Sequence, residues 1–182
     1  MEMKQEFEIA TLAGGCFWCT EAVFLELEGV KSVVSGYIGG LTVNPTYKDI
    51  CNGDTDHAEA IQITFDPHII TFGELLEIFF ATHDPTTLNR QGNDVGTQYR
   101  SEIFYHNQNQ KEISQEYISI LNTQNTFGKP VVTKVSPATL FYPAETYHSD
   151  YYNRNKEQSY CSYVITPKIA KLKKGFADKL KK

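Results

Sequence analysis

The sequence has few cysteines and no long apolar run. Four cysteines among 182 residues are too few for the disulfide scaffolds on which small secreted domains depend. No apolar run approaches the roughly 20 residues of a membrane-spanning helix, and we find no internal repeat or low-complexity tract. The first residues mix acidic and basic side chains before a short apolar run at residues 9–13, which is not the pattern of a secretory signal. We therefore expect a cytoplasmic protein whose thiols stay reduced.

Charge is distributed unevenly along the chain. The net charge is −5, yet seven of the 17 Lys and Arg residues follow Thr166, where Asp178 is the only acidic residue. Apolar residues recur there at steps of three and four, which predicts a basic amphipathic helix over about residues 167–181. We expect this helix to close the domain, and we expect neither nucleic acid nor a membrane as a partner.

The order of predicted elements indicates an α+β fold. The length favours one domain over residues 1–182. Hydrophobic periodicity and helix-capping signals predict strands at residues 7–12, 30–37, 57–65 and 99–105, with helices at residues 16–27 and from residue 71 to about 82. This βαββαβ order is the split βαβ of the ferredoxin-like plait, which places two helices on one face of an antiparallel sheet. A polar helix at residues 111–121, a strand at 130–135 and a loop-rich segment at about 136–163 follow.

The stretch Gly14-Gly15-Cys16-Phe17-Trp18-Cys19 places a cysteine where a predicted strand turns into a predicted helix. Unpaired N–H groups and the positive end of the helix macrodipole favour the thiolate there, and the thiolate is the nucleophilic form. Cys16 is therefore a candidate catalyst. The alternative is that it is a small buried hydrophobic residue, as free cysteines often are.

Glu59 lies in phase with Ile61 and Ile63, on the apolar side of its predicted strand. Burial disfavours the charged carboxylate and raises the pKa, which keeps such a group able to donate a proton near neutral pH. A structural ion pair at the strand end is the alternative. Tyr99 shares the face of Ile103 on the next predicted strand, so its phenol is expected to point into the same interior.

The polar connection between His83 and Gln98 is long and lacks periodicity. Connections of this kind are usually functional or disordered. Asp84-Pro85 and Asn93-Asp94 are turn formers, which favours an ordered functional loop over a flexible linker.

Together these segments resemble the peptide methionine sulfoxide reductases of the A type. The resemblance is carried by Gly15-Cys16-Phe17-Trp18, by Tyr47 after Asn44-Pro45-Thr46, by His57-Ala58-Glu59, and by the stretch from His83 to Ser101, and it runs from Gly14 to about Cys161. It implies a plait-type core, in agreement with the predicted element order. It also implies reduction of the S epimer of methionine sulfoxide, free or in oxidised proteins, to methionine.

The resemblance implies roles for individual residues. Cys16 corresponds to the nucleophile that attacks the sulfoxide sulfur, and Glu59 to the acid that protonates the sulfoxide oxygen. Tyr47 and Tyr99 correspond to phenols that hold this oxygen, and Asp94 to a supporting carboxylate.

The neighbouring aromatic residues Phe17 and Trp18 correspond to the apolar wall that accepts the substrate's methyl group. An S–CH₃ group favours aromatic contacts, whereas the S=O group needs hydrogen-bond donors, so the two sides of the expected pocket suit the two halves of the substrate. Ordinary core packing is the alternative for both residues.

The reaction would leave Cys16 as a sulfenic acid that a second thiol must resolve. Cys161 aligns with the family's recycling cysteine, whereas Cys19 lies three residues from Cys16 and Cys51 lies in a loop. The resemblance implies a Cys16–Cys161 disulfide that thioredoxin, or another dithiol, reduces directly. We expect no bound cofactor and no metal.

Two other functions compete with this interpretation. A thioredoxin-like dithiol oxidoreductase would use Cys16 and Cys19 as its redox pair, but it gives no role to Glu59, Asp94 or the tyrosines. A zinc module commonly needs two Cys-x-x-Cys pairs, and the sequence holds one.

Overall fold

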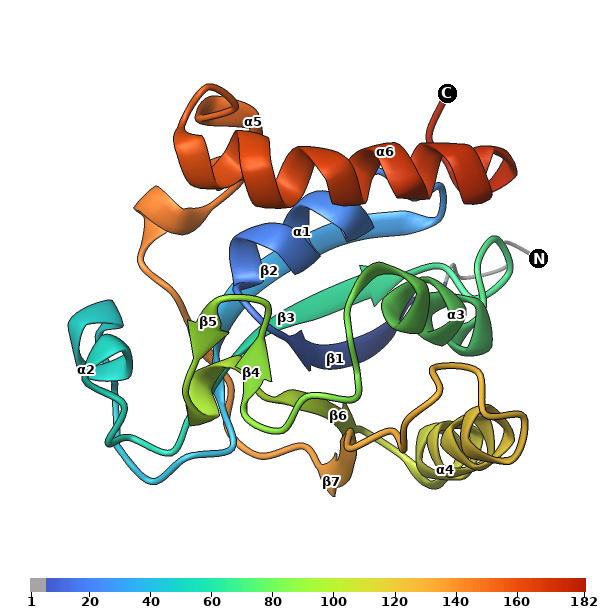
Figure 1. Cartoon of the computed structure of the whole chain (residues 1–182), viewed down its shortest axis with the longest axis horizontal. Helices are drawn as coiled ribbons and strands as arrows, with labels where there is room; N and C mark the ends of the chain where they lie inside the picture. Colours follow the sequence, from blue (N-terminus) through green and yellow to red (C-terminus); the bar gives the residue numbers. More distant parts are fainter. Residues whose placement is uncertain (1–5) are drawn as a thin grey trace.

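A six-stranded sheet forms the centre of the computed structural model, which describes residues 6–182 (Figure 1). Its order is β7-β6-β1-β3-β2-β8. The strands are β1 (Glu8–Gly14), β2 (Val30–Ile38), β3 (Ala58–Phe65), β6 (Ser101–Tyr105), β7 (Lys134–Pro137) and β8 (Tyr142–Pro143). The prediction of one domain over residues 1–182 also included Met1–Gln5, which lie outside the described residues.

Helices and a small hairpin surround this sheet. The helices are α1 (Phe17–Leu25), α2 (Tyr47–Asn52), α3 (Phe72–Thr82), α4 (Gln108–Thr123), α5 (Tyr151–Arg154) and α6 (Thr166–Gly175). The strands β4 (Arg90–Gln91) and β5 (Asp94–Val95) form a separate antiparallel hairpin. Within residues 6–182 no helix is both long and apolar enough to cross a membrane.

The four central strands confirm the predicted plait. In the order β6-β1-β3-β2 every neighbouring pair is antiparallel, with Leu12 opposite Ile61 on one side and Ile103 on the other. Numbered by their place in the βαββαβ unit, these strands run 4-1-3-2 across the sheet. The α+β class and the split βαβ arrangement were therefore predicted correctly from the sequence.

Three predictions about individual elements were wrong. Tyr99 lies in a 3₁₀ turn, Thr97–Tyr99, and strand β6 begins only at Ser101. The strand predicted at residues 130–135 is β7, shifted toward the C-terminus and parallel to β6, so the sheet is mixed. The basic helix predicted to reach residue 181 ends at Gly175 as α6, because glycine is a poor helix former, and the chain continues in a short 3₁₀ turn.

The main core lies on one face of the sheet. Ile61 and Ile63 of β3 belong to the same buried cluster as Phe24 of α1 and Phe79 of α3. Helix α6 runs across α1 as a further layer in Figure 1 and buries Leu172 in this cluster. The N-terminal end of α1 is thereby enclosed between the sheet and the C-terminal segment, and this is where the predicted site residues meet.

Candidate active site

Cys16 lies at the N-terminal end of α1, as predicted, and is 8% exposed. The chain reaches it through Gly15, whose φ of +95° is rarely adopted by other residues. A Cβ atom at this position would also lie 2.7 Å from the Gln91 side chain. The glycine therefore permits both the tight turn into α1 and the close approach of the β4–β5 hairpin.

Glu59 lies beside this turn and is 1% exposed. Its Oε1 accepts a hydrogen bond from the Phe17 N–H at 3.1 Å, whereas Oε2 is buried with no hydrogen-bond partner among residues 6–182. Burial raises the pKa of this carboxyl to about 8, against the lowering effect of the Phe17 hydrogen bond. The carboxyl is therefore mostly protonated at neutral pH, in the direction expected from the sequence. The salt bridges found among residues 6–182 do not include Glu59, so the structure does not show the alternative ion pair.

Three phenols surround Cys16 and Glu59. Burial raises the pKa of Tyr47 and of Tyr99, and the negative charge of Glu59 acts on both in the same direction. Burial likewise raises the pKa of Tyr160, and the charges of Cys16 and Cys19 raise it further. All three phenols therefore keep their protons and serve as hydrogen-bond donors near neutral pH.

Asp94, on the β4–β5 hairpin, adds a second carboxylate to the site. Its Oδ2 accepts a hydrogen bond of 2.6 Å from the Tyr160 hydroxyl. Its charge also contributes to the raised pKa of Glu59. The predicted loop between His83 and Gln98 is thus ordered, and it carries a carboxylate to within electrostatic range of Glu59.

Phe17 and Trp18 provide the aromatic part of the site. The Phe17 ring is fully buried and lies 5.0 Å, centroid to centroid, from the imidazole of His148. Trp18 donates its indole N–H to His148 Nδ1 at 3.0 Å and stacks on Tyr151 with centroids 3.8 Å apart. Residues from the C-terminal segment therefore fix the orientation of the indole.

The expected preference of Cys16 for the thiolate is wrong for the protein without substrate. Burial raises its pKa well above the ordinary value, with added contributions from Cys19 and Glu59, and these outweigh the lowering effect of the Trp18 backbone N–H. The position at the start of a helix is as predicted, but the enclosure of the thiol is stronger than the effect of the helix end. In the free protein Cys16 therefore carries its proton at neutral pH.

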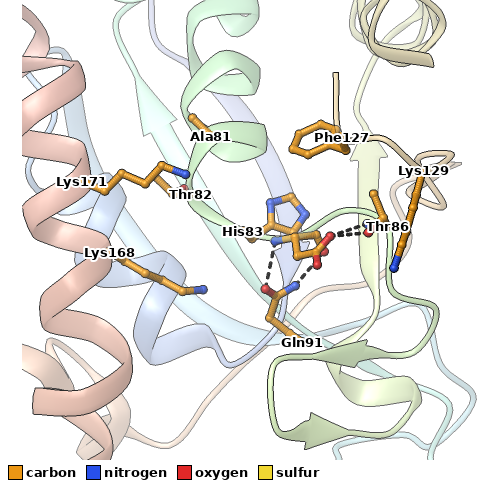
Figure 2. Close-up of a pocket in the computed structure, with 10 residues that line it drawn as sticks. Ala81, Thr82, His83, Thr86, Gln91, Phe127, Lys129, Lys168 and Lys171 are labelled. Atoms are coloured by element: carbon orange, nitrogen blue, oxygen red, sulfur yellow. Dashed lines mark hydrogen bonds between the residues drawn. The ribbon is translucent and has the colours of Figure 1, made fainter. Parts of the chain in front are cut away.

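A cavity of about 400 Å³ opens onto both thiols of the Cys-x-x-Cys stretch. Cys16 and Cys19 line it together with the hairpin residues 91–94 and side chains of the C-terminal segment that include Tyr160 and Lys168. A second cavity of about 470 Å³ adjoins it and shares Gln91 and Lys168 with it (Figure 2). The thiols are therefore reached from the side where the hairpin meets α6.

A model of the family described as peptide methionine sulfoxide reductase matches residues 8–180. The chain belongs to this family. A peptide methionine sulfoxide reductase MsrA of Deinococcus radiodurans is 56% identical over 174 residues, covering 96% of this chain and 84% of the relative. The MsrA of Saccharolobus solfataricus is 57% identical over 174 residues, covering 96% of this chain and 97% of the relative.

Solved structures of peptide methionine sulfoxide reductases share the fold. Reduced Mxr1 from Saccharomyces cerevisiae superposes with a TM-score of 0.75 at 35% identity, covering 88% of this chain and 92% of Mxr1. Mxr1 has also been solved in complex with Trx2, and that chain gives a TM-score of 0.52 at 26% identity over 82% of this chain and 90% of Mxr1.

The structure brings most of the predicted site residues together and leaves one apart. Contacts or electrostatic interactions connect Cys16, Phe17, Trp18, Tyr47, Glu59, Asp94 and Tyr99 around one point. Cys161 lies in a π-helical turn, Cys161–Ile165, and is 0% exposed. All four cysteines are free thiols. Cys161 does not line the cavity onto which Cys16 opens.

The sequence interpretation missed Tyr160 and Tyr151 in the site of this peptide methionine sulfoxide reductase. Tyr160 binds Asp94, and Tyr151 stacks on Trp18, but both follow a stretch without periodicity. The only feature of the sequence that could have placed these two tyrosines in the site was their position shortly before Cys161. Within residues 6–182 no group of three or more His, Cys, Asp or Glu side chains is arranged to hold a metal ion.

Proposed function

We propose that the chain reduces the S epimer of methionine sulfoxide, free or in oxidised proteins, at Cys16, and that thioredoxin regenerates the enzyme. The observation that carries this proposal is the protonated Glu59 carboxyl, buried beside Cys16 with an unpartnered oxygen. A buried polar group without a partner is costly. A sulfoxide oxygen placed at Glu59 would accept its proton and remove that cost.

The reductive step uses Cys16 and Glu59 together. Cys16 attacks the sulfoxide sulfur as Glu59 protonates the oxygen, and the proton of the Cys16 thiol replaces the one that Glu59 has given away. The oxygen leaves the substrate as the hydroxyl of a Cys16 sulfenic acid, and methionine is released. Because both groups are protonated in the free protein at neutral pH, no proton from solvent is required.

Other side chains orient the substrate. We assign Tyr47 and Tyr99 as donors to the sulfoxide oxygen, because both phenols lie within the electrostatic range of Cys16 and Glu59. Asp94 supports this arrangement through its charge near Glu59. Phe17 and Trp18 supply the apolar surface for the substrate's methyl group.

Regeneration requires a second thiol and an external dithiol. We assign Cys161 as the thiol that holds the disulfide reduced by thioredoxin. The related Mxr1 forms a complex with Trx2, which supports thioredoxin as the reductant of this chain too. The cytoplasm is the compartment that suits this cycle, because it supplies reduced thioredoxin and keeps the four thiols free.

The test is to incubate the protein with each epimer of a methionine sulfoxide peptide and a dithiol. We expect methionine from the S epimer alone and little reduction of insulin, which is the assay for a dithiol oxidoreductase. Insulin reduction without sulfoxide reduction would favour that alternative, in which Cys16 and Cys19 form the redox pair.

A further inference from the structure

Cys16 and Cys19 lie one above the other on the first turn of α1. The Cys19 N–H donates to the Cys16 carbonyl oxygen at 3.0 Å, and the Cys16 thiol forms a hydrogen bond to the Cys19 sulfur. Both side chains line the same cavity of about 400 Å³. The two thiols therefore interact with each other and open onto one cavity before any reaction takes place.

The position of Cys16 just before α1 allows a disulfide between them. Residues three apart on a helix have Cβ atoms roughly 5–6 Å apart, and a disulfide brings its Cβ atoms to roughly 3.5–4.5 Å, so a small local approach is needed. Cys16 is the residue before α1, with a non-helical ψ of 127°, so its backbone can supply this approach while α1 stays helical from Phe17 onward.

Cys161 is buried and interacts with Cys19. The π-helical turn that carries it packs against α1. Burial raises the pKa of the Cys161 thiol, and the charge of Cys19 raises it further. Cys161 does not line the cavity onto which Cys16 opens. Cys19 therefore interacts with both other thiols, whereas within residues 6–182 no interaction between Cys16 and Cys161 is found.

The surroundings of Cys19 favour its thiolate. The hydrogen bond from Cys16 lowers the pKa of Cys19 to about 7, and the positive charge of Lys168 acts in the same direction. The Tyr160 hydroxyl lies 3.6 Å from the Cys19 sulfur. Figure 2 shows Lys168 reaching from α6 toward Gln91, where the two cavities adjoin. A thiol whose pKa is near the ambient pH is well suited to thiol exchange.

We propose that Cys19 is the first thiol to attack the Cys16 sulfenic acid and that it then passes the disulfide to Cys161. This relay rests on the proposed function, which supplies the sulfenic acid. In the first step the Cys19 thiolate displaces hydroxide from Cys16, the hydroxide takes a proton to become water, and a Cys16–Cys19 disulfide forms.

In the second step the Cys161 thiolate attacks the sulfur of Cys19. A Cys19–Cys161 disulfide forms and Cys16 leaves as a thiolate, ready for another sulfoxide. An external dithiol then reduces the Cys19–Cys161 bond and becomes a disulfide itself. The relay leaves Cys161 as the thiol presented to thioredoxin but removes the need for it to enter the Cys16 pocket.

Single-turnover experiments on Cys19→Ser and Cys161→Ser test the relay. Each protein is mixed with a methionine S-sulfoxide peptide, quenched at intervals, and examined for methionine formed, for sulfenic acid trapped by dimedone, and for disulfides by peptide mapping. We expect about one methionine per protein in both variants, because attack by Cys16 comes first. Cys161→Ser should yield a Cys16–Cys19 bridge, and Cys19→Ser should lose the Cys16 sulfenic acid at least tenfold more slowly than the parent.

Two results would overturn the relay while leaving the proposed function intact. One is a normal methionine burst in Cys19→Ser followed by a Cys16–Cys161 bridge at the parental rate. The other is a Cys161→Ser protein without a Cys16–Cys19 bridge. Absence of the methionine burst in the parent protein would instead contradict the proposed function itself.

Lys168→Gln adds a milder variant with a matched control. Removing this positive charge should slow the decay of the Cys16 sulfenic acid several-fold while leaving the methionine burst unchanged. Lys171→Gln removes a charge from the same helix at a position that lines only the second cavity, and we expect the parental rate. Equal rates in both variants and the parent would remove Lys168 from the relay.

Discussion

The site consists of two halves that differ in how the chain builds them. The sheet-borne half, Cys16, Phe17, Trp18 and Glu59, lies on strand β3 and on the turn from β1 into α1. The C-terminal half, His148, Tyr151, Tyr160 and Cys161, lies on short turns and helices that follow the loop-rich segment. Regular hydrogen bonding of the sheet fixes the first half, whereas aromatic contacts and single hydrogen bonds hold the second.

The two halves suit different steps of the reaction cycle. Proton transfer requires donor and acceptor to stay within hydrogen-bond reach, and the sheet-borne half provides this through the Glu59 contact to the Phe17 N–H. Disulfide exchange requires thiols to change partners, which suits segments held by few bonds. Substitutions in the first half should therefore affect the reductive step, and those in the second half regeneration and substrate alignment.

The most severe test of the sheet-borne half is Cys16→Ser. Serine is similar in size but supplies no thiolate, so we expect loss of turnover with a native unfolding temperature. Sulfoxide reduction and thermal unfolding are measured side by side. Cys51→Ser is the matched control: this exposed thiol on α2 bonds to Tyr47 but is not the nucleophile, so its loss should lower turnover far less than Cys16→Ser. Substantial activity in Cys16→Ser would contradict the assigned nucleophile.

Glu59→Gln should lower the rate of the reductive step by roughly 10²- to 10⁴-fold, the usual share of general acid catalysis. Glutamine keeps the shape but gives no proton to the sulfoxide oxygen. Rapid-quench measurement of methionine separates this step from regeneration. Glu77→Gln, on the exposed side of α3, is expected to leave the rate unchanged, and a Glu59→Gln rate within a few fold of the parent would make Glu59 a structural residue.

The pH dependence of the reductive step also tests Glu59 as the general acid. The pKa of Glu59 is raised to about 8, so its acid form is present below that pH and is lost as the pH rises. The rate of the reductive step should therefore fall by about tenfold per unit above pH 8. Single-turnover rates between pH 6 and about 10 test this, and the falling limb should be missing in Glu59→Gln.

Tyr160→Phe tests the C-terminal half. It keeps the ring against Trp18 and removes the hydroxyl that binds Asp94 and approaches Cys19. Hydrogen bonds to charged groups contribute roughly 1.5–3 kcal/mol, and the partial exposure of this pair favours the lower end. We expect a decrease in turnover of about tenfold, since 1.4 kcal/mol corresponds to that factor. The double variant with Asp94→Asn should be no slower than the slower single variant; additive losses would show that the two residues act independently.

Tyr151→Ala should have the smallest effect. Stacking between aromatic rings contributes roughly 0.5–1.5 kcal/mol, so we expect KM to rise several-fold while the rate of chemistry changes little. Trp18 is the only tryptophan, so its fluorescence reports directly on loss of the Tyr151 ring. Tyr151→Phe keeps the stack and should match the parent in both measurements; a Phe variant as impaired as the Ala variant would rule out stacking as the cause.

Local patterns were enough to predict the central fold and the sheet-borne half. The alternation that placed Glu59 in phase with Ile61 and Ile63 is a property of a strand's two faces, so it predicted burial and a raised pKa correctly. Gly15 before Cys16 predicted the turn into α1 in the same way. Tyr99 was placed on a strand because the sequence carries no clear signal for the 3₁₀ turn that precedes β6.

The C-terminal half could not be predicted because its positions depend on contacts between residues far apart in the sequence. Tyr160 binds Asp94 across 66 residues, and Trp18 binds His148 across 130. No periodicity marks such pairs, since their partners lie on separate elements that meet only after folding. The ionisation of Cys16 belongs to the same class, because the enclosure that raises its pKa is produced by several elements together.

The sequence by itself thus determined the plait, the place of Cys16 at a helix start and the inward side of Glu59, since each follows from the conformational preferences of a few neighbouring residues. Only the tertiary structure decided which ring covers Trp18, that Cys161 is buried beyond the Cys16 cavity, and which of the Cys16 and Cys19 thiols is the more acidic. These depend on burial and on distances between separate elements, and burial is a property of the assembled fold.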